Sequence, residues 1–367
     1  MLKYFSVSGY KNFNDPIELD FSDVRDYRFS TECISNGLLS KIIVYGKNAA
    51  GKSNFANALF DICNLRIDFS KIEKDDFYLN VSNTKGYAEF RYVFQFGKNT
   101  VDYSYRKTPT WDLLYEKIII DNELLVEYDR ERPDCINAEN LQKLLPNLGS
   151  GYKHMASLLY LIAGNMPYDI PYEMQHPTRK AVEFIYNLKM GISWEFMDSS
   201  LSRHIEHIIK VGRVDRFEDF LHTAGVNEKL VVHEDPSGKQ VLYFDVKPPL
   251  PFYQAASSGT KALCGLFMLY VAARYDERPQ MFILDEFDAF YHYELAEQIV
   301  RMFLSLPNVQ VIFTSHNTLL LTNRYMRPDC CFIISNGRLV ALPNATNMEL
   351  REGHNLQKLF IGGEFSE

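Results

Sequence analysis

The chain has 367 residues, 46% of them hydrophobic and 23% charged. This length can bury a large core in two or three structural units, and this composition excludes a disordered protein. A net charge of −8 and a pI near 5.7 argue against a protein that binds nucleic acid over its whole surface. They are compatible with a local basic patch.

No export signal or membrane span is expected. The opening MLKYFSVSGY lacks the charged and apolar regions of a signal peptide, and no apolar run approaches the roughly 18 residues of a spanning helix. The six cysteines are scattered and form no CxxC pair, so we expect reduced thiols and neither zinc nor redox chemistry. We therefore expect a cytoplasmic protein with no membrane partner.

In chain order, the first pattern predicts a β-hairpin-like start, with a turn at Gly9 and a second strand over 17–21. Residues 41–45 (KIIVY) are typical of a central parallel strand. A helix is predicted over 52–62. Alternating aromatic and polar residues over 87–120 predict an antiparallel sheet.

The remainder of the chain predicts helices first and then alternating strands and helices. Helices are expected over 137–224, including MASLLYLIAG and AVEFIYNLKMG, followed by a hairpin with its turn at 235–238. The last third predicts helices over 261–274 and 294–304 and strands over 281–284 and 309–314. Such alternation indicates a parallel sheet, so we expect one α/β nucleotide-binding unit that is split by a helical insertion.

The most specific motif is GKNAAGKS, which fits the phosphate-loop pattern G-x-x-x-x-G-K-[ST] between a strand and a helix. A glycine-rich turn and a helix N-terminus aim several backbone N–H groups at one anion. Lys52 would pair with the β- and γ-phosphates, and the Ser53 hydroxyl would ligate magnesium. The alternative, an incidental glycine turn, does not explain this context. The candidate nucleotide contacts are Gly46, Lys47, Asn48, Ala49, Ala50, Gly51, Lys52, Ser53 and Asn54.

Two further apolar strands end in polar residues. MFILDE would place Asp285 in the magnesium shell and Glu286 beside the attacking water, although an acidic solvated turn is a common alternative. VIFTSHN would deliver His316 to the same edge of the sheet, where it could donate to the γ-phosphate or to the water. A lone histidine at a strand end is more often structural, and here the other motifs favour a functional role.

A fourth motif, Ser257-Ser258-Gly259-Thr260, directly precedes a predicted helix. One interpretation is a simple helix N-cap. Its place, one helix before the Asp285 strand, also matches the signature loop of ABC-type ATPases, whose helix N-terminus caps the γ-phosphate held by a partner subunit.

In this order the four motifs resemble the ABC ATPase superfamily, and more narrowly the soluble SMC/RecF/OLD-like branch of AAA-family ATPases. VSGYKNF near the start, DEFDAFYH from Asp285 and REGHNL from Arg351 also look like that branch. Most similar are single-head ATPases encoded in bacterial abortive-infection and other anti-phage loci. The resemblance covers nearly all of 1–60 and 250–367 and is weak between them.

The resemblance implies an α/β P-loop NTPase of the ABC-ATPase head type, with a parallel core sheet, an antiparallel sheet and a helical insertion. It divides the chain into an N-terminal head part (1–125), the insertion (126–228) and a C-terminal head part (229–367). It implies ATP and Mg²⁺ as cofactors, with Ser53 and Asp285 on the metal and Glu286 and His316 in catalysis. The signature residues would act across an ATP-dependent homodimer or higher oligomer; they are Ser257, Ser258 and Gly259.

The chain also departs from the family pattern. Ser-Ser-Gly-Thr replaces the transporter Leu-Ser-Gly-Gly-Gln, and Asn-Ala-Ala replaces the commoner Asn-Gly-Ala. Gln95 is a candidate for the glutamine loop, although an exposed strand residue is the favoured account. The chain has no sustained heptads, which excludes long coiled-coil arms. It ends too soon after His316 for a nuclease domain, so an effector would be a separate protein.

The favoured hypothesis is an ATP-dependent switch that acts as the sensor or regulator of a separate nuclease or toxin in anti-phage defence. One alternative is a RecF-like DNA-binding repair ATPase that uses the basic stripe Arg203, His207 and Lys210, with Arg213 and Arg216 close behind. Acidic residues interleave with this stripe and favour a solvated helix face instead. The other alternative is an ATP-binding assembly scaffold with little turnover.

Overall fold

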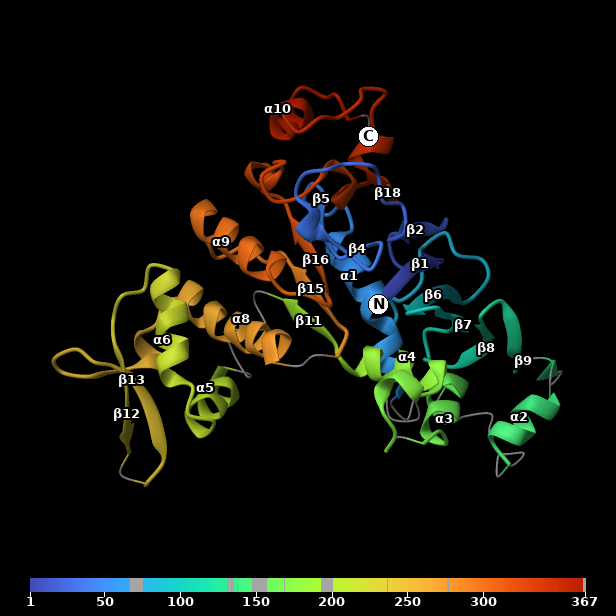
Figure 1. Ribbon diagram of the computed structural model, residues 1–367, viewed down its shortest axis with the longest axis horizontal. Coiled ribbons are helices and arrows are strands. Elements are labelled where there is room, and N and C mark those ends of the chain that lie inside the picture. The colour runs from blue at the N-terminus through green and yellow to red at the C-terminus, as the bar shows by residue number, and fades with distance from the viewer. Residues whose placement is uncertain are drawn as a thin grey trace.

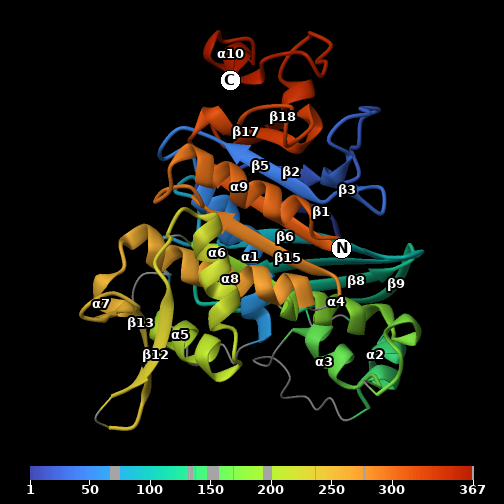
Figure 2. The same ribbon diagram turned by 60° about the vertical axis from the view of Figure 1, so that its left-hand side comes forward.

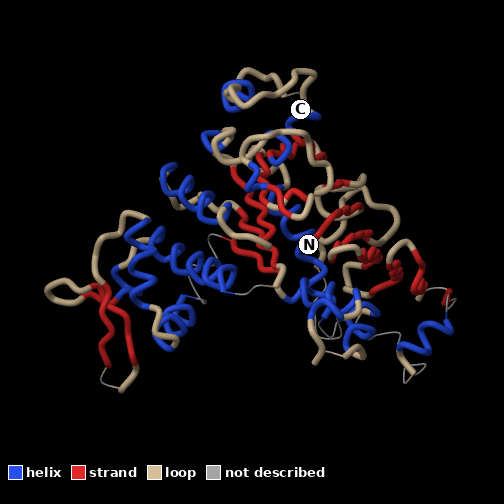
Figure 3. Tube along the Cα trace, in the orientation of Figure 1, coloured by secondary structure: helices blue, strands red, loops and turns tan. Residues whose placement is uncertain are grey.

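The computed structural model describes residues 1–66, 75–130, 132, 135–136, 138–146, 157–167, 169–192, 201–235, 237–275 and 278–365. Strands lie in three main groups, a central sheet, a larger antiparallel sheet beside it and a hairpin on the far side (Figures 1 and 3). The central and the antiparallel sheet form the body of the molecule. Among the described residues, no helix is long and apolar enough to cross a bilayer.

The core sheet has six strands in the order β11-β15-β16-β5-β17-β18, all parallel to their neighbours except β18. Strands β5, β15 and β16 are buried along their whole length, as their apolar sequences require when both faces of a parallel sheet are covered. The strands are β5 (Lys41–Tyr45), β11 (Leu188–Ile192), β15 (Gln280–Asp285), β16 (Val309–Ser315), β17 (Cys331–Ser335) and β18 (Arg338–Ala341).

The second sheet is antiparallel and has seven strands in the order β10-β9-β8-β7-β6-β1-β2. Buried and more exposed residues alternate along β6, so that one face of the sheet carries a row of aromatic core residues. The strands are β1 (Leu2–Ser8), β2 (Ile17–Asp20), β6 (Ala88–Phe96), β7 (Asn99–Lys107), β8 (Leu113–Ile120), β9 (Glu123–Asp129) and β10 (Cys135–Ile136). A separate short pair is formed by β3 (Ile34–Ser35) and β4 (Leu38–Leu39).

Helix α1 (Lys52–Phe60) links the two sheets. The Tyr92 hydroxyl of β6 donates to the Ala58 carbonyl at 2.8 Å, and the rings of Phe55 and Phe5 lie 6.0 Å apart. Helices α8 (Ser258–Tyr275) and α9 (Tyr293–Leu304) meet through Tyr270 and Phe303, and Phe303 also packs on β15 and β16. Three short helices border the antiparallel sheet in Figure 1: α2 (Ala138–Leu144), α3 (Leu158–Gly164) and α4 (Pro177–Tyr186).

A separate lobe precedes the α8 helix and occupies the left of Figure 1; we call residues 201–257 the Ser257 lobe. It comprises α5 (Leu201–Lys210), α6 (Val214–Thr223), β12 (Leu230–Glu234), β13 (Gln240–Phe244), β14 (Leu250–Pro251) and α7 (Phe252–Ala255). Phe217 of α6 packs on Phe267 of α8 with ring centroids 5.1 Å apart, which anchors the lobe to α8. The C-terminal α10 (Leu356–Ile361) lies at the top of Figure 1.

Most predicted elements are present. The 41–45 strand is β5, the antiparallel strands over 87–120 are β6 to β8, and the predicted hairpin is β12 paired with β13. The hairpin turn closes through Asp235 N–H to the Lys239 carbonyl at 2.9 Å, with one residue of the predicted turn, 236, outside the described residues. Helix α3 begins at Leu158 within the predicted MASLLYLIAG, whose first two residues, 155–156, are also outside them.

One predicted helix is wrong in its second half. AVEFIYNLKMG was expected to be helical throughout, but α4 ends at Tyr186 and Leu188–Ile192 form the edge strand β11. Periodicity cannot separate a strand from a helix over five mostly apolar residues. Backbone pairing with β15 decides the outcome here. The span that the sequence assigns to a helical insertion therefore also supplies a strand to the core sheet.

A buried ion pair connects the end of α1 to the antiparallel sheet. Lys107 of β7 is fully buried, and its Nζ lies 2.5 Å from Oδ2 of Asp61, the residue that follows α1. The Tyr105 hydroxyl donates to the other carboxylate oxygen at 2.7 Å, and Trp111 covers Lys107 at 4.0 Å from the ring centroid. Burial lowers the pKa of Lys107, although Asp61 opposes the shift. The pair thus fixes the position of α1 against the second sheet.

Replacing Lys107 with Met should lower the free energy of unfolding by about 3–5 kcal/mol, because Asp61 is then left as a buried charge without its counter-ion. Urea denaturation measures this loss. The double variant Asp61→Asn with Lys107→Met should recover most of it. The more exposed Lys117–Glu127 pair provides the comparison: Lys117→Ala should cost at most about 1 kcal/mol. A similar loss in Lys107→Met and Lys117→Ala would contradict a structural role for the buried pair.

Candidate functional site

The register of the core sheet brings three of the predicted motifs to one edge. In β16 and β5, Ser315 pairs with Tyr45, and in β15 and β16, Leu284 pairs with Phe313. The loop from Gly46, the Asp285-Glu286 pair and His316 therefore all follow the carboxyl ends of adjacent parallel strands. This edge is where ligands bind in open α/β sheets.

The loop between β5 and α1 needs its glycines. Gly51 is the N-cap of α1 with φ +102°, a conformation that side chains with a Cβ rarely adopt. A Cβ on Gly46 would lie 2.7 Å from the Ile334 side chain and 2.9 Å from its carbonyl oxygen. Ala49 also has a positive φ of 63°, so the turn is strained at a second position. This strained turn leads directly into the N-terminus of a helix, which is the arrangement that binds phosphate.

Lys52 lies inside the loop. It is 4% exposed, and its Nζ donates to the carbonyl oxygens of Gly46 at 2.9 Å and Lys47 at 3.1 Å. A buried ammonium that donates to neutral carbonyls can exchange those contacts for phosphate oxygens. The candidate metal ligand Ser53 is half-buried in the first turn of the same helix.

The predicted VSGYKNF segment packs on this loop. The Phe13 ring lies 3.3 Å from the position that a Cβ on Gly51 would take, and Asn54 Nδ2 donates to Asn12 Oδ1. The N-terminal segment therefore lines one side of the phosphate loop.

Thr314 couples the two acidic residues to the neighbouring strand. Its hydroxyl donates to Asp285 Oδ1 at 2.5 Å and accepts the backbone N–H of Glu286 at 2.8 Å. Asp285 is 2% exposed, while Glu286 is half-buried and has a positive φ of 46°. Thr314 was not among the residues predicted for the site, although the sequence carries a signal for it, a hydroxyl near the end of an otherwise apolar strand.

Ser315 makes a second hydrogen-bonded link, which joins the turn after β15 to the backbone on the far side of His316. Its Oγ donates to Asp288 Oδ2 at 2.7 Å and accepts the Asn317 backbone N–H at 2.9 Å. Burial raises the pKa of Asp288, and the bond from Ser315 opposes that shift. The His316 side chain is exposed at this edge. The turn after β15 and the segment around His316 are thus connected by hydrogen bonds.

The Ser257 motif begins α8 and is accessible. Ser257 Oγ accepts the Thr260 backbone N–H at 3.1 Å, which is the geometry of a helix N-cap. Ser257 and Ser258 are exposed, and a Cβ on Gly259 would lie 3.0 Å from the Phe290 carbonyl oxygen. Figure 2 shows α7, just before Ser257, at the margin of the molecule and α1 near its middle.

Other predicted residues lie elsewhere. Gln95 is half-buried in β6, and its backbone N–H donates to the Met1 carbonyl at 2.8 Å. In the basic stripe, Arg213 and Arg216 pack over the Tyr275 ring at 4.7 and 5.2 Å. The other residues of the stripe are exposed on α5; they are Arg203, His207 and Lys210.

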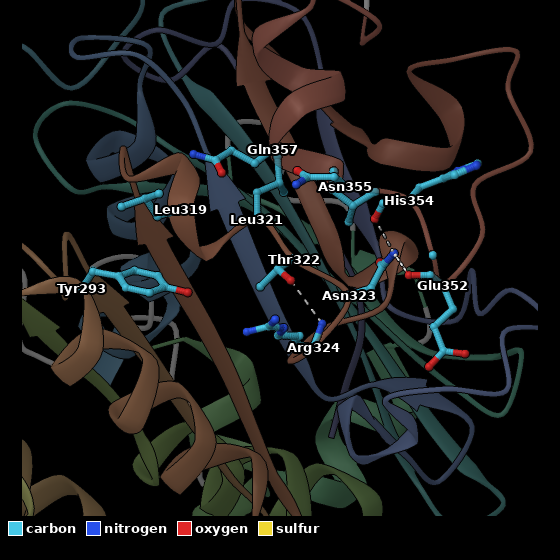
Figure 4. Close-up of a pocket in the computed structure, with 12 residues that line it drawn as sticks. Tyr293, Leu319, Leu321, Thr322, Asn323, Arg324, Glu352, His354, Asn355 and Gln357 are labelled. Atoms are coloured by element: carbon cyan, nitrogen blue, oxygen red, sulfur yellow. Dashed lines mark hydrogen bonds between the residues drawn. The ribbon is translucent and has the colours of Figure 1, made fainter.

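The REGHNL segment joins the chain that follows His316. Asn323 Nδ2 donates to the carbonyl oxygens of Arg351, Glu352 and His354 at 3.0 to 3.2 Å. A polar hollow of about 520 Å³ lies between these segments, with Tyr293 on its opposite wall (Figure 4). The C-terminal segment is thereby attached to the part of the chain that carries the candidate catalytic histidine.

Comparisons with known proteins bear on the fold of the chain. Residues 181–322 match the family described as "AAA domain, putative AbiEii toxin, Type IV TA system". A crystal structure of the SMC head bound to the C-winged helix domain of ScpA has a TM-score of 0.54 and 15% identity, and the match covers 94% of this chain and 99% of that chain. At this identity the likeness shows the fold.

The SMC head domain from Thermotoga maritima also matches, with a TM-score of 0.44 and 15% identity over 95% of this chain and 99% of that chain. The fold assignment rests on the first structure. No curated protein matches the sequence significantly.

Replacing Thr314 with Val should lower the free energy of unfolding by about 1–3 kcal/mol, because the isosteric side chain removes a donor to buried Asp285 and an acceptor of the Glu286 N–H. Thr314→Ser keeps the hydroxyl and should cost clearly less. Urea denaturation of the two variants provides the measurement. Equal losses would mean that methyl packing, and not the hydroxyl, is what Thr314 contributes.

Proposed function

Because the chain has the head fold of an ABC-type, SMC-like AAA ATPase, we propose that it binds and slowly hydrolyses ATP between two copies of itself. The observation that carries this proposal is the common sheet edge. A phosphate loop, an acidic pair and a histidine follow three adjacent parallel strands, β5, β15 and β16. Parts of this kind, a phosphate loop with an acid-ended strand beside it, are those that P-loop phosphoryl transfer uses.

Each residue at the edge has a separate proposed role. Lys52 would leave the carbonyls of its own loop and pair with the β- and γ-phosphates, while the N–H groups at the start of α1 hold their oxygens. Ser53 and Asp285 would hold Mg²⁺, which neutralises the charge that develops on the phosphates. Glu286 would orient the attacking water, and His316 would donate to the γ-phosphate.

The hydroxyl of Thr314 serves this chemistry indirectly. It fixes both the Asp285 carboxylate and the Glu286 backbone, so the metal ligand and the water-orienting residue keep a constant separation. Thr314 is thus a positioning residue in the proposed reaction.

We infer that Ser257, Ser258 and Gly259 act on the nucleotide of a second copy. Ser257 and Ser258 are exposed at the N-terminus of the 18-residue helix α8, and Gly259 is half-buried beside them. A helix N-terminus favours an anion, and a second copy can supply one if its bound ATP faces this loop. Two nucleotides would then be enclosed by a symmetric pair.

We further propose that closure of this pair regulates a separate effector protein, such as a nuclease or toxin, in anti-phage defence. The match to a family described by a putative AbiEii toxin supports the setting. The SMC head of the solved structure is bound to a winged-helix domain of ScpA, which shows that a head of this fold can carry a protein partner. The links through Thr314 and Ser315 would transmit hydrolysis from the acidic turn to the segment around His316.

Two other functions predict different behaviour. A RecF-like DNA-binding ATPase would bind DNA in the presence of ATP with a steep salt dependence, which would be lost on neutralising Arg203 and Lys210. A scaffold with little turnover would hydrolyse ATP at the same low rate with Glu286 or with Gln in its place. Arg213 and Arg216 are already engaged by Tyr275, which leaves fewer cations in the stripe for phosphate.

The first test is the solution mass of Glu286→Gln with and without ATP and magnesium, measured by light scattering beside the wild type. We expect Glu286→Gln to lose at least about a hundredfold in turnover, within the range for removal of a general base, and to accumulate as an ATP-dependent dimer. Lys52→Ala in the same background should stay monomeric because it cannot hold the phosphates.

Each other outcome has a distinct meaning. The proposal would be rejected if wild type and Glu286→Gln had equal turnover and a solution mass that did not change with nucleotide. A constitutive oligomer whose Glu286→Gln form still loses turnover would keep the catalytic assignment and favour a preassembled scaffold.

A further inference from the structure

A hollow of about 750 Å³ lies at the amino-terminal edge of the core sheet. Pro279 on its wall directly precedes β15, and Leu38, also on its wall, lies in β4 just before β5. Strands β5 and β15 run from this edge to the edge that carries the phosphate loop and Asp285, over five and six residues, or roughly 15–20 Å. The hollow is therefore separate from the candidate ATP site.

The lining of this hollow is more apolar than polar. Three of its side chains, Met1, Leu38 and Phe96, are buried in the core, and Pro279 and the ring of Tyr172 extend the apolar wall. Figures 1 and 2 show the N-terminus close to β6 and α4, which also contribute to the hollow. Apolar walls with a few polar groups and a volume of about 300–1,000 Å³ are typical of small-molecule sites.

Lys180 of α4 brings a buried positive charge to this wall. It is 6% exposed, and its Nζ donates to the Glu173 carbonyl oxygen at 2.9 Å and lies 5.4 Å from the centroid of the Tyr172 ring. Both of these partners are neutral. Of the acids in this region, Glu183 pairs with Arg179 at 3.1 Å, and the Glu173 side chain is exposed to solvent. A buried ammonium in such surroundings favours an anion that can enter the hollow.

Tyr172 supplies a second hydrogen-bond donor on the same wall. Its hydroxyl oxygen is buried and has no hydrogen-bond partner among the described residues. Burial, together with the charges of Glu183 and Glu173, raises the pKa of Tyr172 to about 12, so the hydroxyl keeps its proton at neutral pH. A buried hydroxyl without a partner is destabilising, and an acceptor atom on a ligand would relieve this.

We propose that this hollow binds a small organic anion, an aromatic or aliphatic body that ends in a carboxylate. The body would cover the apolar wall, and the carboxylate would accept a hydrogen bond from Lys180 Nζ. The charged side chains of the lining are two lysines, Lys98 and Lys180, and one acid, Glu173, so their balance also favours an anion. The inference is independent of the proposed function, because the hollow lies at the other edge of the sheet.

Three probes with the same body and different charge test the site: phenylpropionate, phenylpropanol and phenylpropylamine. Each is titrated into the full chain, and binding is followed by ligand-observed NMR. We expect phenylpropionate to bind at least about tenfold more tightly than phenylpropanol, because only the acid can pair with the buried ammonium. Phenylpropylamine should not bind, because its positive charge would face Lys180.

Variants of the lining locate the binding. Lys180→Met keeps a long side chain without the charge, and it should weaken phenylpropionate at least about tenfold and leave phenylpropanol unchanged. Lys180→Arg keeps the charge and should bind the acid like the wild type. Gln95→Trp places a large ring in the hollow and should abolish binding of both probes. Lys117→Met, on β8 and outside the lining, is the matched control and should bind like the wild type. Thermal denaturation verifies that each variant is folded.

The outcomes separate this inference from the proposed ATPase. Absence of binding, equal binding of the acid and the amine, or phenylpropionate affinity that is unchanged in Lys180→Met and Gln95→Trp would overturn it and leave the ATP site untouched. Displacement of phenylpropionate by ATP and magnesium, with loss of binding in Lys52→Ala, would place the acid in the phosphate loop and would overturn the inference as well.

Discussion

The parallel pairing of β15, β16 and β5 is the constraint on which the site depends. Because these strands run in one direction and in register, their polar carboxyl ends meet at one edge, although the loop after β5 lies more than 200 positions before the ends of β15 and β16 in the chain. The Thr314 hydroxyl then fixes the positions of the Asp285 carboxylate and the Glu286 backbone by hydrogen bonding to both. The apolar interiors of the same strands bury them on both faces, so the site stands on the most rigid part of the fold.

The helix that follows the phosphate loop carries this geometry into the rest of the molecule. Its first residue, Lys52, lies in the loop, and the residue after its last turn, Asp61, is held by Lys107 of the antiparallel sheet. The loop over 75–83 is tied to the same region through Lys11 and through Tyr78, whose hydroxyl donates to Asp61 at 3.4 Å. The candidate phosphate loop, the second sheet and the 75–83 loop are therefore connected by one helix and its ends.

The Ser257 lobe has a different relation to the site. It is anchored to α8 by aromatic packing, and α8 begins with the exposed Ser257 and Ser258. An exposed helix N-terminus favours an anion, and this is the physical reason for proposing that a second copy supplies one.

The sequence by itself determined the local elements and the chemistry they could carry. GKNAAGKS between an apolar strand and a helix, and apolar strands ending at Asp285 and His316, are patterns written in consecutive residues, so the fold class and most of the candidate site were predictable. Only the tertiary structure decided that LKMGI is the edge strand β11, that Thr314 and Ser315 bridge the two motif segments, and that Asp61 meets Lys107. These outcomes depend on backbone pairing and burial between distant segments, which no local periodicity records.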